Sequence, residues 1–264
     1  MTSAPQLSER IFTIEGAAAF LVAAGPERAG APTILLLHGA GMDHRVWHPQ
    51  LAALASGGVQ ALAPDFPGHG RSAGPALTRI PDLADWTIRL ADAFGAESLA
   101  LAGHSMGALV AMEAATRLGA RVAGIALIGA AAEMPVHPAL LEAARQDRAR
   151  ASEMIAGWAF GPAAQADGRA EAGRRLIAAS PPGVLAADLQ ACADYRNGPD
   201  AAAQLRCPVL VLAGEKDKMT PARRGRALAE AIRGARHEEL PEIGHMLPIE
   251  APERVSELLL SIAQ

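Results

Sequence analysis

The chain of 264 residues has only two cysteines, Cys192 and Cys207. Their separation of 15 positions matches neither a zinc-binding nor a redox-active spacing. A disulfide between them is possible but not implied, and we interpret both as ordinary buried or half-buried thiols. We expect the protein to need neither a metal ion nor a cofactor.

Aromatic residues make up only 3% of the chain, and the formal net charge is −4. A weakly acidic chain gives no reason to expect nucleic acid or an anionic membrane as a partner. The shortage of aromatic residues also favours a ligand pocket of modest size with aliphatic walls over an aromatic cage.

The sequence lacks a run of about 18 apolar residues, which is the length that a membrane-spanning helix needs. The apolar stretch 16–24 resembles the core of a signal peptide only superficially. Glu9 and Glu15 are acidic, and no basic region precedes the stretch. We therefore expect a cytoplasmic protein with no membrane partner.

What the sequence does contain is a regular alternation of short apolar runs and helix-like segments. Residues 11–14 and 19–22 predict an opening hairpin. Later runs predict strands over residues 33–37, 59–63, 99–102, 122–128, 208–213 and 236–240. The last of these carries charges and is predicted to lie at an edge. Strands that are apolar throughout are typical of a parallel sheet covered on both faces, so the pattern predicts an α/β fold.

One long segment, residues 133–200, interrupts this alternation because it has no strand candidate. It has helical patterns at 139–145 and 152–158, followed by helix-breaking glycine and proline. We predict a core domain of residues 1–132 and 201–264 with a helical insertion at 133–200. The alternative is an ordinary run of packing helices.

The most informative segment is Gly103-His104-Ser105-Met106-Gly107, which has the form G-x-S-x-G. An apolar run predicts a strand before it, and helix-forming residues follow it. A serine between a strand and a helix lies on a very tight turn, where a Cβ on either flanking glycine would clash with the backbone. Such a turn presents the serine hydroxyl beyond the sheet, at a helix N-terminus. Ser105 is therefore predicted to be a nucleophile.

The chain resembles the α/β-hydrolase family over nearly its whole length. The resemblance is carried, in order, by residues 37–41, residues 65–72, the Ser105 turn, and the pair Asp217 and His245. It implies an α/β-hydrolase fold, with a mostly parallel twisted sheet flanked by helices. It also implies that the insertion 133–200 forms a helical cap over the carboxyl ends of the strands, where ligands bind in such sheets.

A serine hydroxyl needs a base to accept its proton, and histidine has a suitable pKa. Of the eight histidines, His245 follows the last predicted strand within a Gly-His-x-x-Pro-x-Glu segment that matches the family. The resemblance therefore implies that His245 is the base. We interpret His38 as ordering a loop, and His104 as pointing away from the serine side chain.

An acidic residue should hold the base in the correct tautomer. Asp217 follows the run 208–213 and gives the chain order Ser, Asp, His that is typical of the family. Glu215 is the local competitor, and the family pattern favours Asp217. The alternative reading is that Asp217 merely caps a turn.

Attack on a carbonyl creates an oxyanion, which needs preorganised hydrogen-bond donors. The backbone N–H of Met106 follows the nucleophile at the helix N-terminus. The segment 38–41 resembles the oxyanion loop of the family, which implies Ala40 as the second donor. Gly41 is the fallback.

The insertion offers candidates for substrate-binding residues, which could equally be internal packing: Met134, Leu140, Met154, Trp158 and Phe160. The loop 65–72 is interpreted as a rigid turn held by Asp65 and Arg71, in preference to a substrate-facing wall. The basic clusters at 145–150 and 174–175 are interpreted as solvated helix faces.

These features predict a carboxylic ester hydrolase without a cofactor, acting on a small ester, thioester or related acyl compound through an acyl-enzyme. Carbon–carbon bond hydrolysis, haloperoxidase or perhydrolase activity, and hydroxynitrile lysis use the same framework and stay open. Ser105 argues against haloalkane dehalogenases and epoxide hydrolases, which need aspartate at that position. A non-enzymatic ligand-binding or signalling protein with this fold is the alternative from another class.

Overall fold

The structure is a computed structural model, and it describes residues 6–27 and 30–264. Its strands are β1 (Ser8–Ile14), β2 (Ala17–Ala24), β3 (Thr33–Leu37), β4 (Gln60–Pro64), β5 (Leu99–His104), β6 (Val122–Ile128), β7 (Val209–Gly214) and β8 (Arg236–Leu240). Its α-helices are α1 (His48–Ser56), α2 (Ile80–Phe94), α3 (Met106–Leu118), α4 (Pro138–Gln146), α5 (Arg148–Ala159), α6 (Pro162–Ala166), α7 (Arg169–Ala178), α8 (Val184–Asp194), α9 (Gly198–Gln204), α10 (Ala222–Ala231), α11 (Leu247–Glu250) and α12 (Pro252–Ala263). Two short 3-10 helices are η1 (His44–Trp47) and η2 (Gly119–Arg121).

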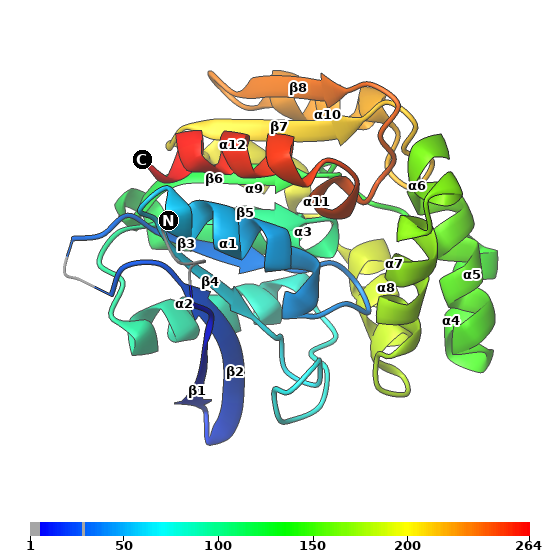
Figure 1. Ribbon diagram of the computed structural model, residues 1–264, viewed down its shortest axis with the longest axis horizontal. Coiled ribbons are helices and arrows are strands. Elements are labelled where there is room, and N and C mark those ends of the chain that lie inside the picture. The colour runs from blue at the N-terminus through cyan, green and yellow to red at the C-terminus, as the bar shows by residue number, and fades with distance from the viewer. Residues whose placement is uncertain (1–5, 28–29) are drawn as a thin grey trace.

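The described strands form one sheet in the order β1-β2-β4-β3-β5-β6-β7-β8 (Figure 1). Neighbours from β4 to β8 are parallel, whereas β2 is antiparallel to both β4 and β1. The predicted hairpin is present, and each later strand lies within two residues of its predicted bounds. The predicted α/β fold, with its mostly parallel sheet and charged edge strand, is therefore confirmed.

Strand β3 shows why an uninterrupted apolar run forms a central strand. Successive side chains of a strand point to opposite faces of the sheet. Leu35 and Leu37 lie in one hydrophobic core, whereas Ile34 and Leu36 lie in a second core on the other face. All four side chains are fully buried. Burial of such a side chain contributes about 1.5–3 kcal/mol, so neither face tolerates a charge.

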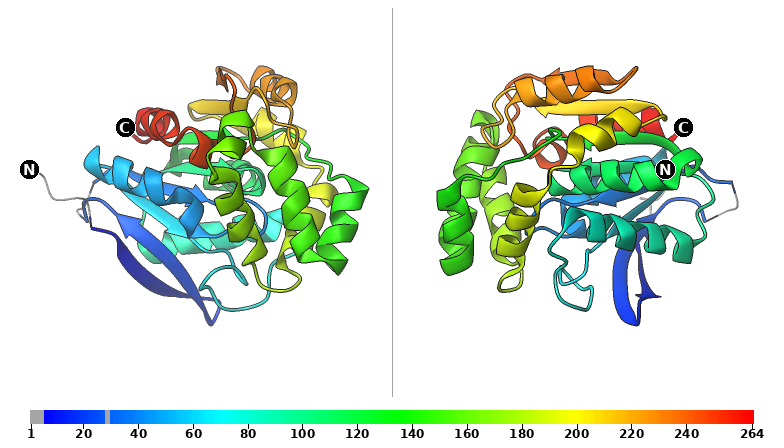
Figure 2. Two further views of the ribbon diagram at one scale, coloured as in Figure 1. Left: turned by 45° about the vertical axis from the view of Figure 1, so that its right-hand side comes forward. Right: turned by 180° about the vertical axis from the view of Figure 1, so that it is seen from behind.

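Helices cover both faces of the sheet (Figures 1 and 2). Helices α1 and α12 pack on the face of Ile34, because Leu54 and Leu259 belong to the same core. Helices α2, α3, α9 and α10 cover the other face, where Leu90 and Leu109 join Leu35. The sheet is therefore sandwiched, and only the ends of its strands are left to form a site.

The whole chain between β6 and β7 is described, and it contains helices and loops but no strand. Helices α4–α8 (residues 138–194), called the inserted helices below, lie beyond the carboxyl ends of β3, β5, β6 and β7 (Figure 1). Helix α9 begins at Gly198 and packs against α3 of the core. The domain bounds at 133 and 200 stay a prediction.

The apolar stretch that resembles a signal peptide core forms β2, which pairs with β1 and β4 in the sheet. Six of its eight residues are buried, from Ala19 to Ala24. None of the described helices combines the length and the apolar character that a membrane-spanning segment needs.

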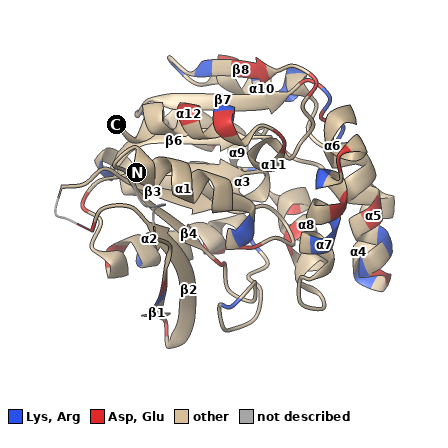
Figure 3. Cartoon of the chain, in the orientation of Figure 1, with Lys and Arg blue, Asp and Glu red and all other residues tan. Residues whose placement is uncertain are grey.

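Charged residues of both signs occur along the inserted helices and β8 (Figure 3). Arg174 and Arg175, for example, both pair with Glu171 on α7. The basic clusters are therefore solvated helix faces, as predicted. Cys192 is buried, Cys207 is half-buried, and both thiols are free, which confirms their interpretation.

Candidate active site

Ser105 lies in a strained turn between β5 and α3. Its φ of 53° and ψ of −118° are rare for a residue other than glycine. A Cβ on Gly103 would overlap the Gly107 carbonyl, and a Cβ on Gly107 would overlap the Leu37 carbonyl of β3. These close approaches are the steric reason for both glycines, and they hold Ser105 at the carboxyl end of the sheet.

Gly103→Ala is expected to destabilise the fold by about 3 kcal/mol or more, because the new Cβ would meet backbone atoms that cannot move aside. Urea denaturation measures the loss. Gly157→Ala is the matched control, since no atom lies within 4 Å of a Cβ at that position in α5. The control should stabilise the protein by up to about 1 kcal/mol through helix propensity. Equal stability of the two variants would contradict the steric explanation.

A buried hydrogen bond joins His245 to Asp217. The Nδ1–H of His245 donates to Asp217 Oδ2 over 2.7 Å. The other carboxylate oxygen accepts the backbone N–H groups of Met219 and Thr220, at 2.8 and 2.7 Å. Because a carboxylate only accepts hydrogen bonds, the imidazole proton lies on Nδ1 and the lone pair lies on Nε2. Asp217 therefore sets both the orientation and the tautomer of His245.

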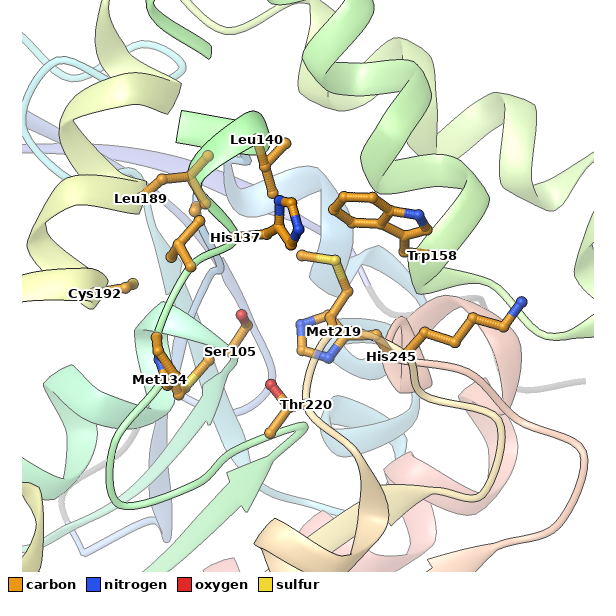
Figure 4. Close-up of a pocket in the computed structure, with 14 residues that line it drawn as sticks. Ser105, Met134, His137, Leu140, Trp158, Leu189, Cys192, Met219, Thr220 and His245 are labelled. Carbon is orange, nitrogen blue, oxygen red and sulfur yellow. The ribbon is translucent and has the colours of Figure 1, made fainter. Parts of the chain in front are cut away.

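Ser105 and His245 line the same cavity, and Figure 4 shows the serine hydroxyl and the imidazole near one another in it. The only described hydrogen bond of the His245 ring goes to Asp217, so the imidazole and the Ser105 hydroxyl are not yet bonded to each other. Such bonds are often long in free enzymes and shorten when substrate binds. The structure thus brings together the three residues that the sequence singled out.

His38 and His104 hold backbone segments around this site. Phe66 N–H donates to His38 Nε2 over 3.1 Å, and burial lowers the pKa of His38 to about 4. His104 Nε2–H donates to the His245 carbonyl over 2.9 Å. Burial, reinforced by the neighbouring His245, lowers the pKa of His104 to about 3. Both rings are neutral at pH 7, and His104 ties the serine turn to the loop of His245.

The structure distinguishes among the backbone donors that the sequence proposed. Met106 is the first residue of α3, so its N–H has no partner within the helix. Ala40 lines the cavity together with Ser105, and its N–H takes part in none of the described backbone hydrogen bonds. The N–H of Gly41 donates to Asp188 Oδ2 over 2.7 Å and is therefore occupied.

The cavity has a volume of about 320 Å³ and lies between the core and the inserted helices (Figure 4). Of the five predicted wall residues, Met134, Leu140 and Trp158 line it. Phe160 does not, because its ring is buried against Gly173 of α7. Met154 does not line the cavity either, and its partly buried side chain packs against the hydrophobic core on the Ile34 face of the sheet.

Sequence reasoning missed several other wall residues. They are Pro135, Val136, His137, Leu189, Cys192, Lys218, Met219 and Thr220. Leu189 and Cys192 lie three positions apart on α8, a spacing that puts them on one helix face. Met219 and Thr220 follow Asp217 directly. These spacings are the signals in the sequence that could have identified them.

The loop of His245 is anchored to the inserted helices by a buried carboxylate. Glu250 accepts the backbone N–H groups of Gly161, Gly244 and Met246, at 2.7 to 3.1 Å. Burial raises the pKa of Glu250 in spite of these three donors. The N–H of His245 itself donates to the Ala159 carbonyl at the end of α5. The position of the imidazole therefore depends on contacts from the inserted helices.

Within residues 6–27 and 30–264, one buried group could offer metal ligands, namely Asp43, His44 and Asp65. Asp65 already accepts the backbone and ring N–H groups of His44 and the N–H of Arg71. Asp43 accepts the guanidinium of Arg45. Because these oxygens are engaged within the protein, the group acts as a hydrogen-bonded support for the loops after β3 and β4.

Comparison with known proteins gives a consistent assignment. A family model described as "Alpha/beta hydrolase family" matches residues 34–258. The carboxylesterase YbfK of Bacillus subtilis (strain 168) is 28% identical over 253 residues, which cover 91% of this chain and 82% of that protein. The crystal structure of the enol-lactonase from Burkholderia xenovorans LB400 superposes with a TM-score of 0.88 at 25% identity, covering 96% of this chain and 99% of that one.

A further relative is the dihydrolipoyllysine-residue acetyltransferase component of the acetoin cleaving system of Pseudomonas putida. It is 32% identical over 246 residues, which cover 88% of this chain and 63% of that protein. The chain thus spans less than two thirds of the length of the first curated relatives that it matches. Among these is epoxide hydrolase A of Mycobacterium tuberculosis (strain ATCC 25618 / H37Rv), which is 35% identical over 46% of this chain and 38% of its own length.

Proposed function

Because the chain belongs to the alpha/beta hydrolase family, we propose that it is a serine hydrolase that cleaves a small ester, thioester or related acyl compound. The proposal rests on one observation above all. The buried hydrogen bond from His245 to Asp217 lies at the cavity that Ser105 also lines. Relatives named as a carboxylesterase and an enol-lactonase support chemistry at a carbonyl carbon.

In the proposed mechanism, His245 Nε2 takes the proton of the Ser105 hydroxyl as Oγ attacks the carbonyl carbon. The imidazolium then gives that proton to the departing alcohol or thiol, which leaves an acyl group on Oγ. His245 next removes a proton from water as the water oxygen attacks the acyl carbon. The imidazolium then returns that proton to Ser105 Oγ as the bond to the acyl carbon breaks, which releases the acid and restores the serine hydroxyl. Asp217 stabilises the imidazolium in both steps because its carboxylate bonds to Nδ1–H.

We assign stabilisation of the negative oxygen in each tetrahedral intermediate to the N–H groups of Ala40 and Met106. Both belong to segments that meet at Ser105, and neither N–H is used elsewhere in the described backbone. Preorganised donors of this kind are worth a factor of about 10²–10³ in kcat each. The reaction as written needs no cofactor.

The inserted helices act in this proposal as a cap that selects the substrate. They contribute Leu140, Trp158 and Leu189 to the cavity wall. The cavity of about 320 Å³ is at the lower end of the range for small-molecule sites, and its walls are mostly apolar. These properties favour a small, uncharged acyl group.

Other reactions of the same framework stay as alternatives. Carbon–carbon bond hydrolysis and perhydrolysis use the same three side chains. Epoxide hydrolysis is disfavoured in spite of the partial relatives, because a serine at position 105 would give an alkyl ether that water does not readily cleave. A binding protein without activity is the alternative from another class.

The experiment that tests the proposal is a substrate panel with the purified chain. p-Nitrophenyl acetate and butyrate, a thioester and a lactone should be hydrolysed, and a fluorophosphonate should label Ser105 as located by mass spectrometry. Cleavage of a diketone without ester turnover would favour carbon–carbon hydrolysis. Peracid formation from acetate and hydrogen peroxide would favour perhydrolysis. Neither turnover nor labelling would contradict the proposal and favour a binding protein.

A further inference from the structure

Asp188 is a buried carboxylate on α8 with contacts to two loops of the core. The side chain is fully buried. Its Oδ2 atom accepts the backbone N–H of Gly41 over 2.7 Å and the ring Nε2–H of His69 over 2.8 Å. Its Oδ1 atom is buried with no hydrogen-bond partner among the described residues. A carboxylate in this setting needs a positive charge close by.

His69 can supply that charge. Its Nδ1 lies 3.0 Å from the Pro67 carbonyl oxygen, and its Nε2 lies 2.8 Å from Asp188 Oδ2. A backbone carbonyl and an ionised carboxylate only accept hydrogen bonds, so with Asp188 ionised each ring nitrogen carries a proton and both bonds form. A histidine with two N–H groups is an imidazolium. The geometry therefore describes a buried ion pair between His69 and Asp188.

This ion pair holds the loop that precedes the proposed site. Gly41 is the neighbour of Ala40, and Gly41 has a φ of 65°. The Leu185 side chain of α8 packs against Gly41 so closely that a Cβ there would collide with it. Asp188 and Leu185 lie three positions apart, which puts them on one face of α8. This face holds Gly41 in place by the hydrogen bond to Asp188 and by the packing of Leu185.

We propose that Asp188 and a protonated His69 form a positioning pair, which fixes the backbone of residues 38–41 so that the Ala40 N–H stays in place for the oxyanion. The inference rests on the proposed function. When His69 loses its proton, the Asp188 carboxylate becomes an uncompensated buried charge, and Asp188 no longer holds the Gly41 backbone firmly in place. Hydrolysis therefore declines at alkaline pH as His69 is deprotonated.

The charges around His69 are consistent with this pair. The titratable groups that face the two side chains are His38 after β3, Asp65 after β4 and Cys192 on α8. Burial by itself would lower the pKa of His69, but the charge of Asp188 and the hydrogen bond to it outweigh burial and raise the pKa. The pair therefore stabilises the fold fully below the pKa of a free histidine. That contribution to stability is lost as the pH rises through the raised pKa of His69 in the folded protein.

Two substitutions at position 188 separate the roles of charge and hydrogen bonding. Asp188→Ala removes the acceptor for Gly41 and should lower kcat about 10- to 100-fold with little change in KM, since a displaced oxyanion donor mainly affects the transition state. Asp188→Asn keeps an oxygen that can accept from Gly41 and from a neutral His69 protonated on Nε2, and only the bond from His69 to Pro67 is lost. It should retain kcat at pH 7 within about tenfold of wild type and lose the alkaline decline. Asp194→Asn, at the exposed end of the same helix, is the matched control and should behave as wild type.

Measurements without substrate test the pair independently. In ¹⁵N NMR, His69 should be doubly protonated at pH 7 in the wild type and neutral in Asp188→Asn. Hydrogen exchange of the Gly41 amide should be faster in Asp188→Ala. A neutral His69 in the wild type, an Asp188→Ala protein with undiminished kcat, or an Asp188→Asn protein as impaired as Asp188→Ala would each overturn the inference. If Asp188→Ala does not fold, NMR and the pH profile of Asp188→Asn decide the question.

Failure of the proposed function has a different signature. Wild-type protein would then neither hydrolyse esters nor react with a fluorophosphonate. A charged His69 and a Gly41 amide protected from exchange would in that case still support the ion pair of Asp188 and His69 as a feature of the fold.

Discussion

Ser105→Ala is expected to lower kcat for p-nitrophenyl acetate by a factor of at least about 10³, and of up to about 10⁶. Alanine has no atom that can attack the carbonyl carbon, so the acyl-enzyme cannot form. The backbone donors at Ala40 and Met106 remain, and they account for the residual activity. Initial rates at saturating ester, with the variant purified separately from any wild-type protein, measure the effect.

Binding and folding should survive this substitution. Alanine occupies the φ of 53° at position 105 with a strain similar to that of serine, so the melting temperature should change little. Ser261→Ala on the exposed side of α12 is the control for removal of a hydroxyl group, and its kcat should equal that of wild type. If Ser105→Ala kept more than about a thousandth of the wild-type rate, Ser105 could not be the nucleophile.

The second large effect is expected for Asp217→Asn, which should lower kcat by about 10⁴. The Asn amide can donate to Nδ1, which would move the imidazole proton to Nε2. His245 would then present an N–H to Ser105 in place of a lone pair, and it could not accept the hydroxyl proton. The measurement is kcat against pH, together with the rate of fluorophosphonate labelling, which should fall in parallel because it needs the same activated hydroxyl.

Glu215 supplies the matched control, because it is the other carboxylate of the same loop. Its Oε2 atom accepts the backbone N–H of Glu242 over 3.0 Å, and its side chain is exposed beside Lys216. Glu215→Gln should therefore keep kcat within about a factor of two of wild type, as is usual for exposed sites. A large loss of kcat in Glu215→Gln, together with normal activity in Asp217→Asn, would show that Glu215 and not Asp217 is the acidic partner of His245.

The local features of the site follow from short stretches of sequence. A continuous apolar run, two glycines around a serine and a helix-forming segment are neighbours in the chain, and their steric requirements act over a few residues. Strand β5, the strained turn and α3 could therefore be predicted together. Asp217 and His245 each follow a predicted strand, and the carboxyl ends of parallel strands lie at one edge of the sheet. The choice of these two residues over Glu215 and the other histidines came from the resemblance to the α/β-hydrolase family.

The cavity wall could be predicted only in part. Phe160 and Trp158 lie two positions apart at the end of α5, and both are large and apolar. Trp158 lines the cavity, whereas Phe160 is buried against Gly173. Composition cannot separate the two, because the choice depends on how α5 is rotated against α7. That rotation is set by packing between helices, which the sequence of one helix does not specify.

The sequence by itself determined the order of the strands and the serine turn, because these depend on local sterics and on chain order. Its resemblance to the α/β-hydrolase family singled out Asp217 and His245. Only the tertiary structure decided which N–H groups are free, which apolar residues face the cavity, and that Asp188 joins His69 and Gly41. These last three residues are distant in the chain and carry no common pattern. Their contact arises because the inserted helices fold back over the ends of the strands, and a buried carboxylate is stable there only beside donors that other segments supply.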